Sequence, residues 1–537
     1  MDSLLSQAEL FETNFGAMDW FIVAVYLLVS VAVGVYANRY ITNLSDFLVA
    51  GRSIRLYLGV ATMTGTEIGL VTIMYQASDG FSRGLATLHV GIVWGAAALL
   101  IGLTGFIVYR LRAMGLMTIP EFYGKRFDTR VRWIGGLVLA GAGILNMGLF
   151  LRAGADFITA VTGLNSHGWL LVIMTGLMVL VLFYTIVGGM VSIVITDLIQ
   201  FIVLSVGMIV VTVFVVSHIG WETIFRVAAE ETGSQGLNPF AEESGYGTIY
   251  VVSMVLVAVS AASLWQSGTL RALSARSPRI AKQIYCLSSI TFMARFVIPA
   301  FWGVCAFAFL ALPENADLAA RVAGTADAAE GMIKPIQAMP LMVGRVVPTI
   351  VLGVIVAAMV AAFMSTHDSY LLCWASVLTQ DVVAPLVRGG LGDRGRIQLT
   401  RLFVLLEGVF LLYWGLWYPA PASLWDYMAT SGAVYLSGAS AVVVCGLYWR
   451  RASSAGALAA VLAGLVVLAP SFVDWRAFHS AGGTASWLTA CLWWLEGYSQ
   501  HKPNLQVIAF AASWYAMVLF SLLFPDTRTD PRKEVPA

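Results

Sequence analysis

Long apolar segments constrain this chain more than any other feature of its sequence. They alternate with short charged connections and lie near residues 18–38, 56–79, 85–109, 133–160, 168–187, 190–217, 248–270, 284–312, 346–379, 402–418, 424–449, 454–473 and 505–524. A helix needs about 20 apolar residues to cross roughly 30 Å of hydrocarbon, and hydrocarbon forces the backbone to satisfy its own hydrogen bonds. The sequence therefore predicts an all-α polytopic membrane protein with about 13 transmembrane helices.

The composition agrees with a membrane-embedded chain and excludes one class of partner. Hydrophobic residues make up 59% of the 537 residues and charged residues 11%, against about 45–50% and about 25% in soluble domains. The formal net charge of +1 leaves no basic surplus for a nucleic-acid surface. The cysteines lack metal-ligand spacing, so we expect small apolar side chains at Cys286, Cys305, Cys373, Cys445 and Cys491.

The positions of lysine and arginine predict the orientation of the chain. Short cytoplasmic loops of membrane proteins carry an excess of these residues. With the N-terminus outside, most of the 31 basic residues fall on the inner side, including the group after the seventh segment: Arg271, Arg276, Arg279 and Lys282. We therefore expect a cytoplasmic C-terminus and residence in a plasma membrane, such as a bacterial inner membrane. The first 17 residues are polar, so we expect no cleavable signal.

The segments divide the chain into expected units. Residues 1–45 form an N-terminal peripheral helix, 46–217 a first unit of five spans, and 248–449 a second unit of five spans. Residues 450–537 hold two C-terminal peripheral helices and a short cytoplasmic tail. Acidic stretches at 218–247 and 313–345, and a tryptophan-rich stretch at 474–504, are expected to be outer segments.

Two segments carry residues that interrupt helices. The second has Gly65 and Gly69 on either side of Thr66 and Glu67, and the seventh has a polar run that comprises Ser260, Ser263, Gln266, Ser267 and Gly268. Such residues at mid-membrane depth are expected where a helix unwinds and exposes carbonyls to a buried site. The two lie five spans apart, so the units would have opposite orientation. This pattern is typical of transporters built from inverted repeats.

The ninth segment offers oxygen atoms in an otherwise apolar run. Ser365 and Ser369 share one helical face, Thr366 is adjacent, and Ala362 lies one turn earlier. Hydroxyls and a backbone carbonyl form the all-oxygen ligand set that a hard cation prefers. The alternative is that these small polar residues only pack helices together and bond to their own backbone.

Six motifs in order resemble the sodium:solute symporter family, which includes sodium/glucose, sodium/proline and sodium/sialic acid carriers. They are DFLVAGRS, TIPEFYGKRF, YTIVGGMVSIVITDLIQ, RALSARS, AAFMST and GLYWRRASSAGALAAVLAG, between about residues 45 and 464. The resemblance implies a core of ten helices in two inverted five-helix repeats, similar to the leucine-transporter fold. It also implies that the chain is not an enzyme but couples solute uptake to Na+ by alternating access.

The resemblance implies a sodium site at the interrupted second segment and the ninth segment. The matching ligands are the carbonyls of Gly65, Ile68 and Ala362 and the hydroxyls of Ser365 and Thr366. Asp197 resembles an acidic residue of the family that supports sodium release or, in some members, a second ion, to which Ser369 is an additional candidate ligand.

Charged and aromatic residues within the segments are candidates for the solute site. Arg295 falls where sugar carriers of the family have a basic residue that touches substrate, and Glu67 where proline carriers have an acidic one. The further candidates are Thr72, Arg152, Trp265, Asp368 and Asp426. Such a charged cavity favours a zwitterion, such as an amino acid, or an organic anion over a sugar. Alternatively the charges neutralise one another, Arg152 with Asp156 and Arg295 with Glu67 or Asp368.

Other functions stay as alternatives. Glu67, His367 and Asp368 are compatible with a proton-coupled carrier of the same fold, although a membrane histidine is more often neutral. A solute sensor is disfavoured, because the tail after Pro525 is short. No catalytic motif and no repeated selectivity loop supports an enzyme or a channel. We expect Na+, a small solute and lipid as partners, no obligatory protein partner, and a solute that the sequence does not name.

Overall fold

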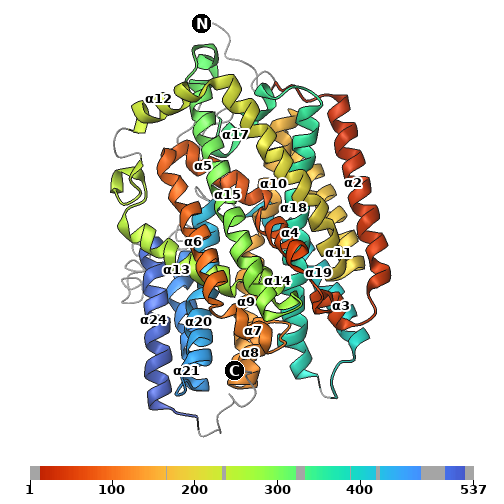
Figure 1. Ribbon diagram of the computed structural model, residues 1–537, viewed down its shortest axis with the longest axis vertical. Coiled ribbons are helices and arrows are strands. Elements are labelled where there is room, and N and C mark those ends of the chain that lie inside the picture. The colour runs from red at the N-terminus through yellow and green to blue at the C-terminus, as the bar shows by residue number, and fades with distance from the viewer. Residues whose placement is uncertain are drawn as a thin grey trace, which may run out of the picture.

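The structure is a computed structural model that describes residues 12–164, 166–232, 237–321, 333–387, 389–418, 424–472 and 502–526. Within these ranges the chain is all-helical, with one isolated β-bridge between Ile54 and Ala275. Figure 1 shows the helices packed into one bundle, with α20, α21 and α24 at one side. Cys491 and most of the predicted outer segment 474–504 lie outside the described residues.

The helices follow the predicted apolar segments. The α-helices are α2 (Ala17–Ala37), α3 (Leu44–Val49), α4 (Leu56–Glu67), α5 (Leu70–Arg83), α6 (Leu88–Thr104), α7 (Val108–Ala113), α8 (Ile119–Arg126), α9 (Thr129–Met147), α10 (Phe150–Thr162), α11 (His167–Ile219), α12 (Trp221–Thr232), α13 (Thr248–Leu264), α14 (Gln266–Ser274), α15 (Pro278–Leu310), α16 (Ala316–Ala319), α17 (Pro335–Val346), α18 (Val351–Val377), α19 (Asp393–Trp417), α20 (Leu424–Tyr448), α21 (Ser454–Leu468) and α24 (Lys502–Leu523). Short 3-10 turns connect several of them, and a π-helical turn, Leu378–Val383, extends α18.

Eleven helical stretches of the described chain are long and apolar enough to cross a membrane. Two of these stretches each join two of the predicted segments: Leu70–Thr104 covers the later part of 56–79 and most of 85–109, and Gly168–Ile219 covers 168–187 and 190–217. The first is interrupted by the turn Gly84–Thr87, which begins at a glycine with φ of 66°.

The second long stretch, α11, is interrupted at Gly189. This residue has φ 48° and ψ −156°, a conformation open to glycine because it has no Cβ. Before the break, the side chain of Leu182 packs on Gly408 of α19; after it, Gly207 faces Ala358 of α18. The first half of α11 therefore contacts α19, and both halves contact α18, since Tyr184 before the break also bonds to Met364.

Both predicted helix interruptions are present. Helix α4 ends at Ile68, whose φ and ψ of −88° and 74° are not helical, and α5 starts after Gly69. Helix α13 ends at Trp265, whose ψ of 120° is extended, and α14 starts at the next residue. Each interruption leaves backbone groups outside the helical hydrogen-bond pattern.

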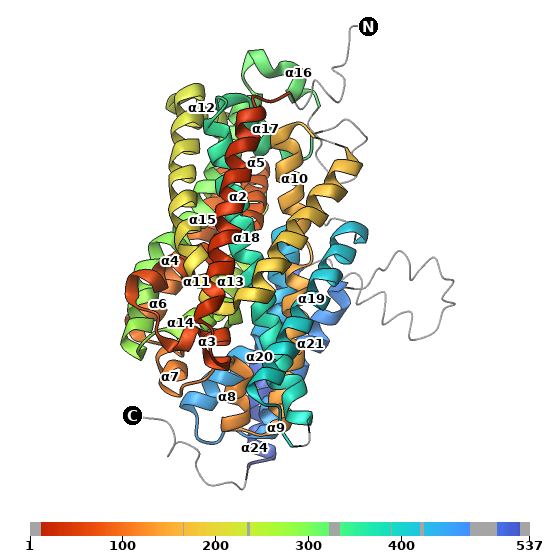
Figure 2. The ribbon, with the colours of Figure 1, turned by 90° about the vertical axis from the view of Figure 1, so that its right-hand side faces the viewer.

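Helix α18 lies in the interior of the bundle (Figures 1 and 2). Every residue from 355 to 377 is buried, so this part of the helix has no face toward lipid. It packs against both halves of α11 and against α2, α9 and α19. Its middle third carries the predicted cation ligands, and the surrounding helices fix that region in place.

Candidate functional site

The end of α4 meets the middle of α18. The hydroxyl of Thr366 lies 3.2 Å from the carbonyl oxygen of Thr66 and 3.1 Å from that of Ala362 in its own helix. A Cβ on Gly69 would lie only 2.6 Å from the hydroxyl oxygen of Thr366. The absence of a side chain at residue 69 therefore permits the close approach of the two helices.

The five predicted sodium ligands gather at this crossing. A Cβ on Gly65 would lie 3.2 Å from the hydroxyl oxygen of Ser365, and Ile68 ends the helix directly before Gly69. All five residues are buried: Gly65, Ile68, Ala362, Ser365 and Thr366. The chemistry of the donor set, hydroxyl and carbonyl oxygen, fits a hard cation. Their role as sodium ligands stays a prediction.

Asp197 of α11 lies beside the crossing and is fully buried. One carboxylate oxygen accepts a hydrogen bond of 2.5 Å from Ser365, and the other accepts one from Thr62 of α4. The second oxygen also lies 3.5 Å from the guanidinium of Arg271. Asp197 thus joins α4, α11 and α18 at one point, next to the predicted sodium ligands.

Arg271 was predicted to lie in an inner loop, and this prediction is wrong. Helix α14 continues to Ser274, and Arg271 is 0% exposed within it. Besides facing Asp197, its guanidinium donates hydrogen bonds to the hydroxyl of Ser369 and the carbonyl of Ser267. The positive-inside pattern could not reveal this, because a basic residue that ends an apolar segment is counted with the following loop.

Asp368 adds a second buried carboxylate to the same network. It accepts hydrogen bonds from the hydroxyls of Tyr184, at 2.9 Å, and Ser369, at 3.0 Å. The hydroxyls of Ser369 and Thr66 lie 3.1 Å apart. Two acidic side chains, Asp197 and Asp368, therefore share one guanidinium in a region that excludes water.

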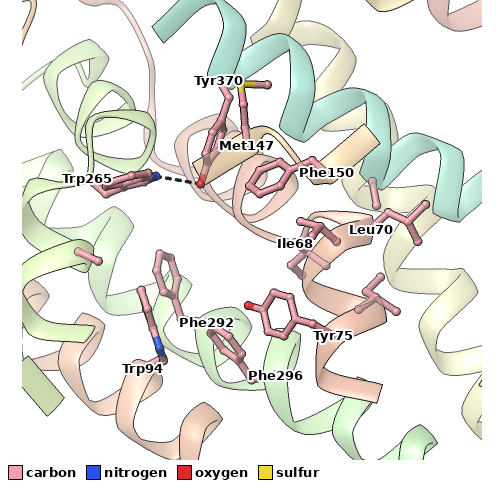
Figure 3. Packing of buried hydrophobic residues seen from close by; sticks show 14 of the residues in the cluster. Ile68, Leu70, Tyr75, Trp94, Met147, Phe150, Trp265, Phe292, Phe296 and Tyr370 are labelled. Atoms are coloured by element: carbon pink, nitrogen blue, oxygen red, sulfur yellow. Dashed lines mark hydrogen bonds between the residues drawn. The ribbon is translucent and has the colours of Figure 1, made fainter. Parts of the chain in front are cut away.

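A cavity of about 70 Å³ lies on the other side of the α4 interruption. Eight aromatic rings line it, namely Tyr75, Trp94, Phe150, Trp265, Phe292, Phe296, Tyr370 and Trp425. Figure 3 shows most of these rings facing one another, with the indole nitrogen of Trp265 donating to the hydroxyl of Tyr370 at 2.9 Å. Thr66 and Thr366 also line it, so the cavity and the cation crossing adjoin.

The charges of the cavity come from Glu67 and Arg295. One terminal nitrogen of the guanidinium donates to the Glu67 carboxylate at 2.5 Å and to the Glu67 carbonyl at 2.6 Å. The guanidinium carbon lies 4.9 Å from the ring centre of Trp94 and 4.6 Å from those of Phe292 and Phe296. Of the two predicted partners, Arg295 therefore pairs with Glu67, and its cation also faces aromatic rings.

The remaining solute candidates divide into two groups. Thr72 and Trp265 line the cavity, whereas Arg152, Asp368 and Asp426 do not. Arg152 lies 3.8 Å from Asp156, the helical neighbour predicted for it.

His367, the candidate for proton sensitivity, is not among the residues that line the cavity. One ring nitrogen lies 2.8 Å from the carbonyl of Phe363, and the two rings are tilted to each other with their centres 3.9 Å apart. The site does not use its charge in this conformation.

The sequence reasoning missed most of the aromatic lining. Phe292 and Phe296 are four residues apart and share a helical face, which was the available signal. The sequence could not show that this face of α15 turns toward Trp94 and Trp425 rather than toward lipid. Arg271 carried a similar signal, because it lies three residues after Gly268 on the interrupted helix.

Two interrupted helices, a buried oxygen-rich crossing and an adjoining cavity define a membrane transporter. The family model described as sodium:solute symporter family matches residues 47–464. The chain therefore belongs to this family, whose members are transporters and not enzymes. The predicted resemblance is confirmed.

Relatives in sequence and structure agree with that family. A sodium/proline symporter of Staphylococcus aureus strain bovine RF122 / ET3-1 is 25% identical over 483 residues, which cover 87% of this chain and 88% of the relative. That of strain Newman is 25% identical over 464 residues, 84% and 85% of the two chains. These bacterial relatives and the family support a multi-pass protein of the plasma membrane.

Two solved structures share the fold. A Na+-coupled sialic acid symporter in a substrate-bound outward-open state has a TM-score of 0.76 at 16% identity, covering 96% of this chain and 100% of that chain. A nucleobase-cation-symport-1 family transporter in a closed conformation with bromovinylhydantoin bound has a TM-score of 0.53 at 14% identity, covering 91% and 97%. At such identities the likeness concerns the fold alone.

Proposed function

We propose that the protein is a sodium-coupled symporter of a small zwitterionic solute, with Na+ held by Gly65, Ile68, Ala362, Ser365 and Thr366. The observation that carries the proposal is the contact between the unwound end of α4 and the hydroxyls of α18. Backbone carbonyls and hydroxyls are the ligands that a partly dehydrated hard cation accepts, and helix interruptions at mid-membrane depth present them.

The charge balance beside the crossing supports a bound cation. Asp197 and Asp368 are both fully buried, and one guanidinium, that of Arg271, faces Asp197 directly and reaches Asp368 through the hydroxyl of Ser369. Isolated charges in a water-free interior are costly, so one further positive charge stabilises the network. Na+ at the crossing supplies it. A second ion at Asp197 and Ser369 would require Arg271 to move, because its guanidinium already contacts both.

The cavity supports a zwitterion over an organic anion. Glu67 and Arg295 together contribute no net charge. A zwitterion that inserts between them pairs its ammonium group with Glu67 and its carboxylate with Arg295, so the cavity stays neutral. The Nε atom of Arg295 is buried without a hydrogen-bond partner, so the guanidinium keeps donor capacity for a carboxylate. The aromatic lining suits an apolar body. L-proline is the first solute to test, because sodium/proline symporters are among the relatives.

The two sites are close enough to couple directly. Thr66 contacts Thr366 of the crossing, and the next residue, Glu67, contacts Arg295 of the cavity. A cation that holds the end of α4 against α18 therefore also positions Glu67. Each ligand then favours the conformation that binds the other, which is the thermodynamic requirement for coupling.

The proposal includes the larger architecture. Thirteen spans, with an outer N-terminus and a cytoplasmic C-terminus, would place ten core helices in two inverted repeats, 46–217 and 248–449, with peripheral helices before and after. The interruptions in α4/α5 and α13/α14, five spans apart, support the repeat. The excess of arginine in the connections assigned to the inner side supports the orientation.

A proton-coupled carrier of the same fold is the second candidate. Two buried carboxylates against one guanidinium favour it, because a proton on Asp368 would neutralise the remaining negative charge as well as Na+ does. Solute counterflow in sodium-free proteoliposomes at several pH values separates the two. Counterflow without Na+ that changes with pH supports the proton, and counterflow that requires Na+ supports the sodium symporter.

A stability screen of the purified protein tests the main proposal. The melting temperature is measured in NaCl and in choline chloride, each with L-proline and a panel of amino acids, betaines, carboxylates and sugars. We expect Na+ alone to raise the melting temperature and a zwitterion to raise it further only with Na+. Equal melting temperatures in both salts for every solute would contradict sodium coupling. A sugar or a simple carboxylate as the stabilising solute would contradict the zwitterion alone.

A further inference from the structure

A second charged cluster lies at one end of the cavity and has no role in the function proposed above. Arg83 ends α5, and its guanidinium lies 3.9 Å from a carboxylate oxygen of Asp79 and 3.9 Å from one of Asp426. Tyr246 and Tyr250 place their ring centres 4.6 Å and 5.9 Å from the guanidinium carbon. We call these five residues the Arg83 cluster.

The Arg83 cluster lies directly over the cavity. Tyr75 lines the cavity, and Asp79 follows it by one helical turn on α5. Trp425 lines the cavity, and Asp426 is the next residue of α20. On α13, Tyr250 precedes the lining residue Val257 by two turns. Three helices that form the cavity therefore each contribute to the cluster at the same end.

The contacts of Arg83 are loose. Distances of 3.9 Å exceed the range of a hydrogen bond, about 2.7–3.2 Å for N–H to O. One terminal nitrogen of Arg83, a carboxylate oxygen of Asp79 and a ring nitrogen of the neighbouring His89 are buried without a hydrogen-bond partner. The guanidinium is thus attracted to two carboxylates and two rings but is not fixed by paired hydrogen bonds, so donor capacity stays available for another anion.

The opposite end of the site is closed differently. The N–H of Ile54, before α4, donates to the carbonyl of Ser274 at 3.2 Å, and the N–H of Arg276 donates to the carbonyl of Ile54 at 2.8 Å. The side chain of Arg112 donates to the carbonyl of Ala275 at 2.6 Å. Well-formed hydrogen bonds to backbone carbonyls tie that end, whereas side-chain charges at longer distance tie the end at Arg83.

We propose that the Arg83 cluster is an outer docking site for the carboxylate of the arriving solute. The assignment rests on the proposed function for the zwitterion and for the outward position of this end of the cavity. A solute carboxylate binds the guanidinium with two hydrogen bonds, which Asp426 does not make, and competes with Asp426 for it. Solute arrival then loosens the contact between α5 and α20 that covers the cavity.

The cluster could instead be a structural tie without a docking role, and the two alternatives differ in their response to an added carboxylate. Arg83→Gln and Asp426→Asn each change the local charge by one unit, so both alternatives predict opposite shifts in the relative reactivity of charged reagents. Only a docking site predicts that a carboxylate ion also slows the anionic reagent and that Arg83→Gln abolishes this slowing, because the carboxylate must bind the guanidinium.

Thiol modification tests this without knowledge of the solute. Ala429, which lines the cavity, is changed to cysteine in a variant whose five native cysteines are replaced by serine or alanine. The rate of modification is measured in sodium-free choline chloride with two methanethiosulfonate reagents. One carries a sulfonate and the other a trimethylammonium group, and the anionic-to-cationic rate ratio is the readout.

We expect Arg83→Gln to lower this ratio about tenfold and Asp426→Asn to raise it severalfold, as for one unit charge a few ångströms from the path. Propionate at tens of millimolar should slow the anionic reagent in the parent protein and not in Arg83→Gln. Arg226→Gln is the matched control, because Arg226 of α12 is exposed and pairs with Glu230; it should leave the ratio unchanged.

If propionate does not slow the anionic reagent in the parent protein, or slows it equally in Arg83→Gln, the docking site is overturned. If Arg83→Gln does not fold, Arg83→Lys retains the charge but not the two-hydrogen-bond geometry. It should keep most of the ratio and lose the propionate effect, and retention of that effect would also overturn the proposal. Failure of sodium coupling would not change these ratios, because neither Na+ nor solute is present.

Discussion

The cation crossing and the solute cavity adjoin, but different chemical groups form them. The crossing consists of hydroxyls and backbone carbonyls from two short segments, the end of α4 and the middle of α18. The cavity is lined by residues from α4, α5, α6, α9, α10, α13, α14, α15, α18 and α20, eight of them aromatic. An ion needs only oxygen at the right distance, whereas a solute needs a shape that many helices must define together.

This difference predicts different responses to mutation. Loss of one oxygen from the crossing acts first on the bound ion, and at Ser365 it also removes a hydrogen bond to the buried Asp197 carboxylate. Loss of a charged lining residue from the cavity leaves a buried partner without compensation, so stability and binding change together. The following substitutions test this contrast, from the largest expected effect to the smallest.

The largest effect is expected for Arg295→Gln. The change leaves the Glu67 carboxylate buried opposite a neutral group, which typically costs about 3–5 kcal/mol of stability. The melting temperature should fall, and solute binding should be lost. The double variant Glu67→Gln with Arg295→Gln should recover the melting temperature but not solute binding. Recovery of both would show that the pair is structural and does not contact the solute.

The double variant Ser365→Ala with Thr366→Ala should come next. Each hydroxyl donated to a cation contributes about 1.5 kcal/mol, so the sodium concentration for half-maximal uptake should rise roughly 100-fold. Ser376→Ala is the matched control, because Ser376 lies on the same buried helix and donates to the carbonyl of Leu372. An unchanged sodium dependence in the double variant would remove α18 from the ion site.

Gly69→Ala should have an intermediate effect. Its Cβ would lie 2.6 Å from the hydroxyl oxygen of Thr366, so the two helices must separate slightly. We expect about a tenfold weaker apparent sodium affinity, equivalent to about 1.4 kcal/mol. In the control Gly141→Ala, on α9, the added Cβ has no atom within 4 Å, and sodium affinity should stay the same. Equal effects in both variants would mean that the contact at residue 69 does not hold the ion site.

Arg152→Gln should have the smallest effect. Arg152 is outside the cavity lining and pairs loosely with Asp156 at 3.8 Å. Partly exposed pairs of this kind contribute about 0–1 kcal/mol. Sodium-driven uptake of the solute found in the stability screen should show an apparent affinity within about threefold of the parent protein. A larger loss would extend the solute site beyond the cavity described here.

The sequence by itself determined the features that depend on local chemistry. Apolar length predicted the helices, because a helix must satisfy its own backbone within hydrocarbon. Gly65, Gly69 and the polar run around Trp265 predicted both interruptions, because helix-breaking residues disrupt a helix at their own position. The hydroxyls of Ser365 and Thr366 were readable because only oxygen-bearing residues in an apolar run suit a cation.

Only the tertiary structure decided which helical faces meet. It placed Arg271 inside the protein against Asp197, paired Arg295 with Glu67, and gathered Phe292, Trp94 and other rings around one cavity. The physical reason is that a side chain at the end of a helix, or on an apolar helix, can contact any of several neighbours with a similar local free energy. The crossing of helices distant in sequence selects among them, and no short segment contains that information.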